Sequence, residues 1–300
     1  MLSFLYKFVS PWAISNKLQI VGNRFMGVIA NFLYKRLCST LREYENNVAN
    51  GVIVTLTTYP GRINEVYYCL QSLLHQRLQP EKTILWLARE QFPNGIKDVP
   101  QRIFDLQDKG LSIEFCDDYR SYKKIVEAAK KWSNYSLVTA DDDTLYPEDW
   151  LENLVETWKA NSKCVVCYRA HKITIRDNAV EPYSNWQGLS KNIKGPLISL
   201  IPIGVGGVLY PPHYFSGVEF NYEEIKNLAP TTDDIWLKVV GLTKQIKVVK
   251  VFENSKEWFT VKGSQTSSLV KHNVEQTNAN DTALRNLMEY YGIGIECFKE

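Results

Sequence analysis

Three consecutive aspartates, Asp141-Asp142-Asp143, are the residues of this chain whose type and spacing most clearly suggest chemistry. Adjacent carboxylates repel one another unless a cation or a network of hydrogen bonds neutralises them. Carboxylate oxygens suit Mg²⁺ or Mn²⁺, and these ions usually complete their coordination with phosphate oxygens and water. The triplet therefore suggests metal-assisted handling of a diphosphate.

Two other interpretations of the triplet are a solvated acidic turn and a calcium loop. The alternating ligands and central glycine of an EF-hand are missing, which argues against the calcium loop. An apolar run over residues 135–140 directly precedes the aspartates, and it predicts a short buried strand. Pro147 then suits the first turn of a helix through about Lys159. The triplet is thus expected at the carboxyl end of a strand, where a loop leads into a helix.

The first half of the sequence alternates between strand and helix patterns. Apolar runs predict strands over residues 52–57, 82–88, 111–116 and 135–140, and helical spacing predicts helices over residues 63–75, 122–132 and 147–159. This alternation predicts an α/β fold with a parallel, Rossmann-like sheet, which binds ligands at the carboxyl edge of its strands. The first turn lacks Gly-x-Gly-x-x-Gly, so a dinucleotide fingerprint is not supported.

Beyond Lys159 the elements become shorter. The sequence predicts strands over residues 165–169, 172–176 and 247–252, and helices over about 222–228, from 231 onward and over about 282–291. Trp186 has polar neighbours and is expected to stack on a sugar ring, with core filling as the alternative. The Gly204–Gly207 segment either lets the backbone approach a ligand closely or makes a tight turn in the core.

Composition and charge narrow the class of protein. With 45% hydrophobic and 12% aromatic residues, the 300-residue chain can bury a full core, and a net charge of +2 does not indicate nucleic-acid binding. From Met1 to Arg42 there are six basic residues and no acidic one. This segment predicts either an interfacial helix on an anionic membrane or a helical arm packed on the main domain or another subunit. Lys or Arg interrupts its apolar runs before they reach the length of a membrane span, and a signal peptide fits poorly.

The cysteines show no dense disulfide pattern, which suits a reducing compartment. Cys164 and Cys167 form a lone C-x-x-C pair inside an expected strand, where residues three apart point to opposite faces. We expect buried thiols there rather than a zinc site.

Five short blocks of sequence occur in an order that is typical of one family of enzymes. They are Thr57-Thr58-Tyr59-Pro60-x-Arg62, Ser121-Tyr122-Lys123-Lys124, Ala140-Asp-Asp-Asp143-x-x-Tyr146-Pro147, Gly204-x-Gly-Gly-Val-Leu-Tyr-Pro-Pro212 and Asp233-Asp234-Ile-Trp-Leu237. Together, over about residues 51–273, they resemble the GT-A class of nucleotide-sugar-dependent glycosyltransferases, and most closely the bacterial family-2-like enzymes that build lipopolysaccharide or capsule. The resemblance implies a GT-A domain over residues 51–275. Outside it lie a basic helical arm and linker over 1–50 and a C-terminal helical tail over 276–300.

The resemblance also implies roles for individual residues. Lys123 or Lys124 would reach a phosphate of the donor, or would be an ordinary solvated helix charge. Asp143 is the expected direct ligand of Mn²⁺ or Mg²⁺ in the D-x-D pattern, and Asp141 and His272 would be further ligands. The remaining contacts to the donor nucleotide would come from Thr58, Tyr59, Arg62, Asp117, Asp118, Asp141 and Asp142.

In inverting enzymes of this class, a carboxylate at the start of a late helix takes the proton of the acceptor hydroxyl. Asp234 is the expected base and Asp233 its partner or an acceptor ligand, although one of the pair is expected to cap the helix. The implied reaction moves a hexose from a nucleoside diphosphate sugar to a glycan or lipid-linked acceptor. A UDP-sugar is the expected donor. The enzyme would be cytoplasmic, at the inner face of the cytoplasmic membrane, with no nucleic-acid partner. The alternatives are a sugar-phosphate nucleotidyltransferase and a non-catalytic nucleotide-sugar or carbohydrate-binding protein of the same fold.

Overall fold

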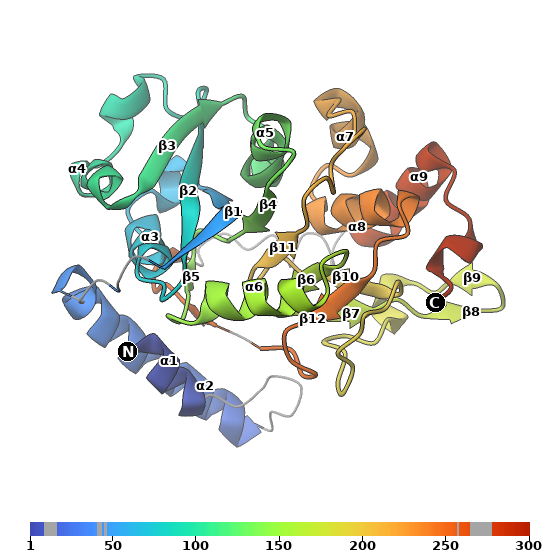
Figure 1. Ribbon diagram of the computed structural model, residues 1–300, viewed down its shortest axis with the longest axis horizontal. Coiled ribbons are helices and arrows are strands. Elements are labelled where there is room, and N and C mark those ends of the chain that lie inside the picture. Colours follow the sequence, from blue (N-terminus) through green and yellow to red (C-terminus); the bar gives the residue numbers. More distant parts are fainter. Residues whose placement is uncertain (9–16, 41–43, 45–46, 257, 265–277) are drawn as a thin grey trace.

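A seven-stranded sheet in the order β12-β6-β11-β4-β1-β2-β3 forms the centre of the molecule (Figure 1). The computed structural model describes residues 1–8, 17–40, 44, 47–256, 258–264 and 278–300. Neighbouring strands are parallel except around β11, which runs antiparallel to both β4 and β6. This confirms the predicted α/β fold with a mostly parallel sheet. The strands are β1 (Val48–Thr57), β2 (Gln79–Ala88), β3 (Leu111–Cys116), β4 (Ser136–Thr139), β6 (Val165–Cys167), β11 (Val208–Tyr210) and β12 (Val248–Lys250).

Both faces of the central part of the sheet are buried, which explains why its strands are mainly apolar. On β1, Val52, Val54 and Leu56 face one hydrophobic cluster, whereas Ile53 faces the other, as the two-residue period of a strand requires. Helices α3 (Val66–Leu74) and α6 (Trp150–Ala160) pack in the first cluster. The second cluster contains residues of α5 (Lys123–Lys131), α7 (Tyr222–Leu228), α8 (Asp233–Thr243) and α9 (Ala279–Tyr291).

Local turn chemistry accounts for one departure from the predicted elements. The strand expected over residues 172–176 is two strands: β7 (Ala170–Lys172), paired with β10 (Leu200–Pro202), and β8 (Ile175–Arg176), paired with β9 (Ala179–Val180). Asp177 and Asn178 join β8 to β9, and both have positive φ, the conformation of the favoured two-residue hairpin turn.

The N-terminal arm consists of α1 (Leu2–Leu5), a turn over Tyr6–Phe8 and α2 (Lys17–Leu37), and it lies at the lower left of Figure 1. The backbone N–H groups of Leu2 and Ser3 donate to the carboxylate of Glu148, at 2.8 and 2.7 Å. Although burial acts to raise it, hydrogen bonds from the chain's amino group and Ser3 lower the pKa of Glu148 to about 2. One face of the arm therefore packs on the main domain. Among the described helices, none has the length and apolarity needed to cross a membrane.

A two-stranded sheet connects this arm to the acidic triplet. β5 (Thr144–Leu145) directly follows Asp143 and pairs antiparallel with β13 (Phe259–Thr260). The Tyr6 hydroxyl donates to the Leu145 carbonyl and accepts from the Phe259 N–H. Segments from the beginning, the middle and the last quarter of the sequence thus meet beside the triplet.

Candidate functional site

The acidic triplet lies at the carboxyl edge of the sheet, where the sequence predicts it. β4 runs parallel to β1, with Thr139 opposite Thr55, so Thr58 and the triplet leave the sheet side by side. The Tyr146 hydroxyl accepts a hydrogen bond from the Asp141 N–H at 2.9 Å, and the Cys69 thiol donates to the Asp141 carbonyl. These contacts hold the backbone of the triplet in a fixed turn.

Asp142 is the buried member of the triplet. Its carboxylate accepts from the Thr58 hydroxyl at 2.6 Å and from the Arg62 guanidinium at 2.7 Å, and Arg62 also lies 3.2 Å from Asp143. Burial raises the pKa of Asp142 in spite of Arg62, and burial together with Asp141 raises the pKa of Asp143 to about 6. Asp142 is thus occupied in holding Thr58 and Arg62, and Arg62 also pairs with Asp143.

Lys124 connects the triplet to the start of α8. Its buried ammonium lies 3.3 Å from an Asp141 carboxylate oxygen and 3.1 Å from one of Asp233. Although burial acts to lower it, Asp233 and Asp141 hold the pKa of Lys124 well above its usual value. One buried cation therefore sets the separation of the two acidic groups, which lie about 90 positions apart in the sequence.

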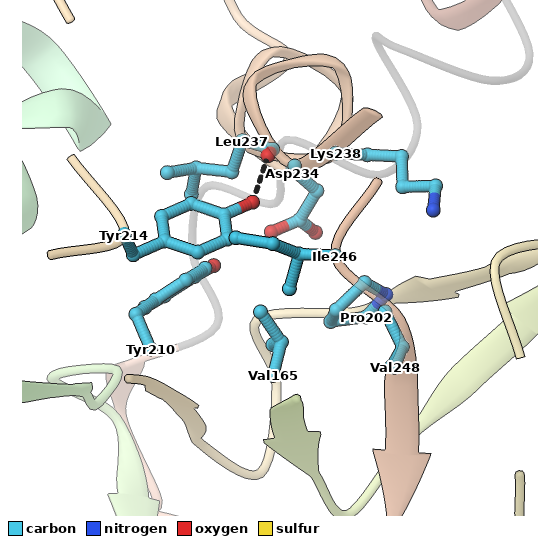
Figure 2. A pocket seen from close by; sticks show the side chains of 10 residues that line it. Val165, Pro202, Tyr210, Tyr214, Asp234, Leu237, Lys238, Ile246 and Val248 are labelled. Atoms are coloured by element: carbon cyan, nitrogen blue, oxygen red, sulfur yellow. Dashed lines mark hydrogen bonds between the residues drawn. The ribbon is translucent and has the colours of Figure 1, made fainter. Parts of the chain in front are cut away.

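Asp234 lies beside the glycine-rich segment, close to Lys124. Its carboxylate accepts a hydrogen bond of 3.1 Å from the Gly204 N–H. It also lines a narrow cavity of about 10 Å³, enough for one water molecule, between α8 and the sheet (Figure 2). In this view the Tyr214 hydroxyl donates to the Leu237 carbonyl beside it. Burial and Asp233 raise the pKa of Asp234 above its usual value.

The Gly204–Gly207 segment is a tight turn against the core, which is one of its two predicted alternatives. A Cβ on Gly207 would fall 2.4 Å from the Trp150 ring, and its φ of +96° favours glycine. The Trp150 ring N–H donates to the Gly206 carbonyl at 2.6 Å. At the other end, a Cβ on Gly204 would lie 3.2 Å from Asp234. The absence of side chains therefore lets Trp150 and Asp234 approach the backbone.

Other predicted residues form a separate polar cluster at the end of β3. Lys123 is buried and lies 2.6 Å from Asp118, which also accepts from Gln91. Although burial acts to raise it, the hydrogen bond from Lys123 lowers the pKa of Asp118. Asp117 pairs with Arg89 at the surface. Of the two predicted lysines, only Lys124 reaches the triplet in the part of the chain that the structure describes.

One prediction of a sugar contact is wrong. Trp186 is buried, with only 6% of its surface exposed, and its ring N–H donates to the Glu181 carbonyl. It packs at 4.8 Å from the Tyr183 ring and fills the core, its alternative role. Its polar sequence neighbours misled the prediction because they lie on loops that face solvent while the indole turns inward.

The oxygen donors of the triplet fit a hard divalent cation. Asp141 and Asp143 supply two carboxylates, which matches Mg²⁺ sites that are completed by water and substrate phosphates. The residues that the structure describes contain no group of three or more His, Cys, Asp or Glu side chains arranged to hold a metal by themselves. The predicted ligand His272 lies outside the described residues. Tyr59 is half-buried beside Arg62, with its ring 5.6 Å from the guanidinium.

A scan against protein-family models matches Glycosyl transferase family 2 over residues 52–209, more than half of the chain. The chain belongs to this family. The matched range begins on β1 and ends on β11, and it includes Thr58, Arg62, Lys124 and the triplet. The family match indicates glycosyl transfer as the activity class of this family 2 glycosyltransferase.

Solved structures resemble this glycosyltransferase only distantly. A cytidylyltransferase from Leptospira borgpetersenii serovar Hardjo-bovis matches with a TM-score of 0.42 at 13% identity, over 85% of this chain and 98% of that one. The inositol-1-phosphate CTP transferase from T. maritima matches with a TM-score of 0.41 at 11% identity, over 83% and 98%. CMP:2-keto-3-deoxy-manno-octonic acid synthetase, complexed with CTP, matches with a TM-score of 0.38 at 11% identity, over 70% and 91%. A search of curated proteins found no significant match.

Proposed function

We propose that this protein is an inverting, metal-dependent hexosyltransferase that uses a nucleoside diphosphate sugar, with a UDP-sugar as the first donor to test. Its acceptor is a glycan or a lipid-linked sugar in the synthesis of a bacterial surface polysaccharide, at the inner face of the cytoplasmic membrane. One observation carries the proposal. Lys124 joins Asp141 of the triplet to Asp233 at the start of α8, so a group suited to a diphosphate lies beside a group suited to an acceptor.

In the donor half, Asp141 and Asp143 are the residues that would hold Mn²⁺ or Mg²⁺. The cation would supply charge neutralisation for the departing diphosphate, an effect of several kcal/mol. Arg62 keeps Asp142 and Asp143 in place through its ion pairs. Asp117 and Asp118, at the end of β3, are the proposed acceptors for hydroxyl or amide groups of the nucleoside.

In the acceptor half, Asp234 is the proposed general base. The acceptor hydroxyl attacks the anomeric carbon, its proton moves to the Asp234 carboxylate, and the bond from that carbon to the diphosphate oxygen breaks. A raised pKa suits this task, because a base with a pKa near the working pH transfers protons most efficiently. Asp233 is occupied by Lys124 and positions Asp234 at the first turn of α8.

The test is turnover of UDP-, GDP- and dTDP-sugars with Mn²⁺, Mg²⁺ or EDTA, for the wild type, Asp143→Asn and the matched control Asp108→Asn. Asp108 is exposed and distant in sequence from the triplet. We expect one donor to release its nucleoside diphosphate with metal present, in the wild type and control only. The anomeric configuration of the product distinguishes inversion from retention.

Two results would contradict the proposal. Formation of a nucleoside diphosphate sugar from a nucleoside triphosphate and a sugar phosphate would identify a nucleotidyltransferase. Metal-dependent donor binding without turnover, across a panel of glycan and lipid-linked acceptors, would favour a binding protein of the same fold.

A further inference from the structure

The outer face of α2 carries a continuous apolar stripe. Val21, Phe25, Val28 and Phe32 are spaced by four, three and four residues, so they align along one side of the helix. Their exposed fractions are 63%, 65%, 56% and 56%. Phe4 and Phe8, each 61% exposed, add an edge-to-face pair of rings on the neighbouring segment. We call Val21, Phe25, Val28 and Phe32 the α2 stripe.

The opposite side of α2 is fixed to the rest of the molecule. Ala30 and Tyr34 are buried in a cluster with Leu145 and Phe259. The Asn31 side chain donates to the Thr260 carbonyl at 2.9 Å and accepts from the Lys262 N–H at 2.7 Å. The inner face of α2 is therefore packed on the main domain, and the described residues of the chain leave its outer face exposed.

Charge identifies what covers the outer face. Arg24 and Arg36 are exposed on the two sides of the α2 stripe, and Arg36 stacks on the Phe32 ring at 4.3 Å. The first 42 residues contain six basic residues and no acidic one. A second copy of this same basic face would be repelled, whereas a surface of anionic headgroups over an apolar layer would satisfy both the arginines and the rings.

We propose that the α2 stripe and its flanking arginines dock this protein on the surface of an anionic bilayer, with α2 lying in the plane of the interface. The aromatic rings enter the boundary between headgroups and acyl chains, and Arg24 and Arg36 contact the lipid phosphates. This inference does not depend on the proposed reaction, because the surface is complete without donor or acceptor.

The docking surface is rigidly connected to the catalytic edge. Asn31 on α2 bonds to both residues that flank Val261, and the Val261 N–H donates to the Asp143 carbonyl at 2.7 Å. A bilayer bound to α2 therefore lies at a fixed position relative to the triplet. An acceptor carried by a lipid in that bilayer would meet the site in a restricted range of orientations.

The experiment measures co-sedimentation of the full-length protein with vesicles of phosphatidylcholine alone or mixed with phosphatidylglycerol. The stripe variant carries Phe25→Ser and Phe32→Ser, and the matched control carries Ile96→Ser and Phe104→Ser, which replace two exposed apolar residues outside the arm. We expect the wild type and control to bind the anionic vesicles and the stripe variant to bind about 100-fold more weakly. Arg24→Gln and Arg36→Gln should each weaken binding about fivefold at low salt.

Thermal unfolding of each variant checks its fold, which we expect to be unchanged because the altered side chains are exposed. Equal binding of the stripe variant and wild type would overturn the proposal, as would failure of the wild type to bind anionic vesicles. A wild-type dimer that the stripe variant converts to a monomer, without vesicle binding, would show that a second copy covers the stripe. Donor hydrolysis without acceptor, measured in the same samples, reports separately on the proposed reaction.

Discussion

Lys123 and Lys124 are neighbours at the start of α5, yet they belong to two different polar clusters. Lys123 pairs with Asp118, whose side chain is 30% exposed, at the end of β3. Lys124 pairs with Asp141 and Asp233, which are more buried, between the triplet and α8. Consecutive side chains on a helix point about 100° apart, so adjacent lysines reach different sites. The first cluster joins two neighbouring segments, whereas the second joins the acidic triplet to the start of α8, the two halves of the proposed site.

Replacing Lys124 should produce the largest effect. Lys124→Met leaves Asp141 and Asp233 without their shared cation, and breaking such a buried group is expected to lower the free energy of unfolding by about 3–5 kcal/mol. Turnover should fall to background because both halves of the site lose their spacing. Chemical denaturation and product formation measure the two quantities. Retention of wild-type turnover would contradict the role of Lys124 as the connecting cation.

Asp234→Asn tests the proposed acceptor half of the site alone, because it leaves Lys124 and its partners Asp141 and Asp233 in place. We expect kcat to fall about 10²–10⁴-fold, with donor binding retained, because only the general base is lost. In the wild type, the raised pKa of Asp234 means that the base becomes active as pH rises toward neutrality, so kcat/KM should increase with pH over that range. The variant should lose this rise. A pH–rate profile with the same rise in both proteins would assign the base to another residue.

Gly204→Ala perturbs the same cluster by a single methyl group. Its Cβ would lie 3.2 Å from Asp234 and 3.4 Å from the Lys124 ammonium, so the carboxylate must move by a few tenths of an ångström. A displaced catalytic group should lower kcat by about tenfold, with a stability change below about 1.5 kcal/mol. Gly188→Ala is the matched control, because a Cβ there meets nothing within 4 Å. Equal kinetics of the two variants would show that the fit at Gly204 is loose.

Lys123→Met should have the smallest effect, which makes it the counterpart of Lys124→Met. The partly exposed pair with Asp118 contributes no more than about 1 kcal/mol to stability. Because the pKa of Asp118 is lowered in the folded state, that contribution is present above the unfolded value of about 3.9 and is lost as pH falls below it. The variant should therefore differ from the wild type at pH 7 and converge with it in acid, as followed by urea unfolding. Donor KM should rise a few-fold if Asp118 contacts the nucleoside.

The half of the sheet from β3 to β4 could be predicted from the sequence because its strands are mostly apolar, and β1, β2 and β4 are largely buried. Largely apolar runs such as that of β1 indicate such strands, and the helices α3, α5 and α6, which follow β1, β3 and β4, have apolar faces. The strands β5, β11 and β13 have only two or three residues each, too few for a periodic pattern. Their positions follow from partners far away in the sequence, which local patterns do not contain.

The sequence predicted which polar residues would form the candidate site, but not which residues each of them would contact. The position of the triplet after an apolar run was sufficient to place it at the sheet edge. The connection through Lys124 could not be predicted, because Asp141 and Asp233 approach it only when β4, α5 and α8 are assembled. Tyr146 lies in the same sequence block as the triplet. The hydrogen bond that its hydroxyl accepts from the Asp141 N–H could not be predicted, because it depends on the turn between the two residues.

The contacts of the arm also constrain the order of folding. Tyr6 bonds to Phe259 and Asn31 bonds to Thr260, pairs separated by 253 and 229 positions along the chain. Contacts between such distant residues close the longest loops and so form late. During synthesis the arm leaves the ribosome before residues 259–262, which complete the surface on which it packs. The arm is therefore expected to spend most of the synthesis of the chain undocked, with its apolar inner face exposed to chaperones and membranes alike.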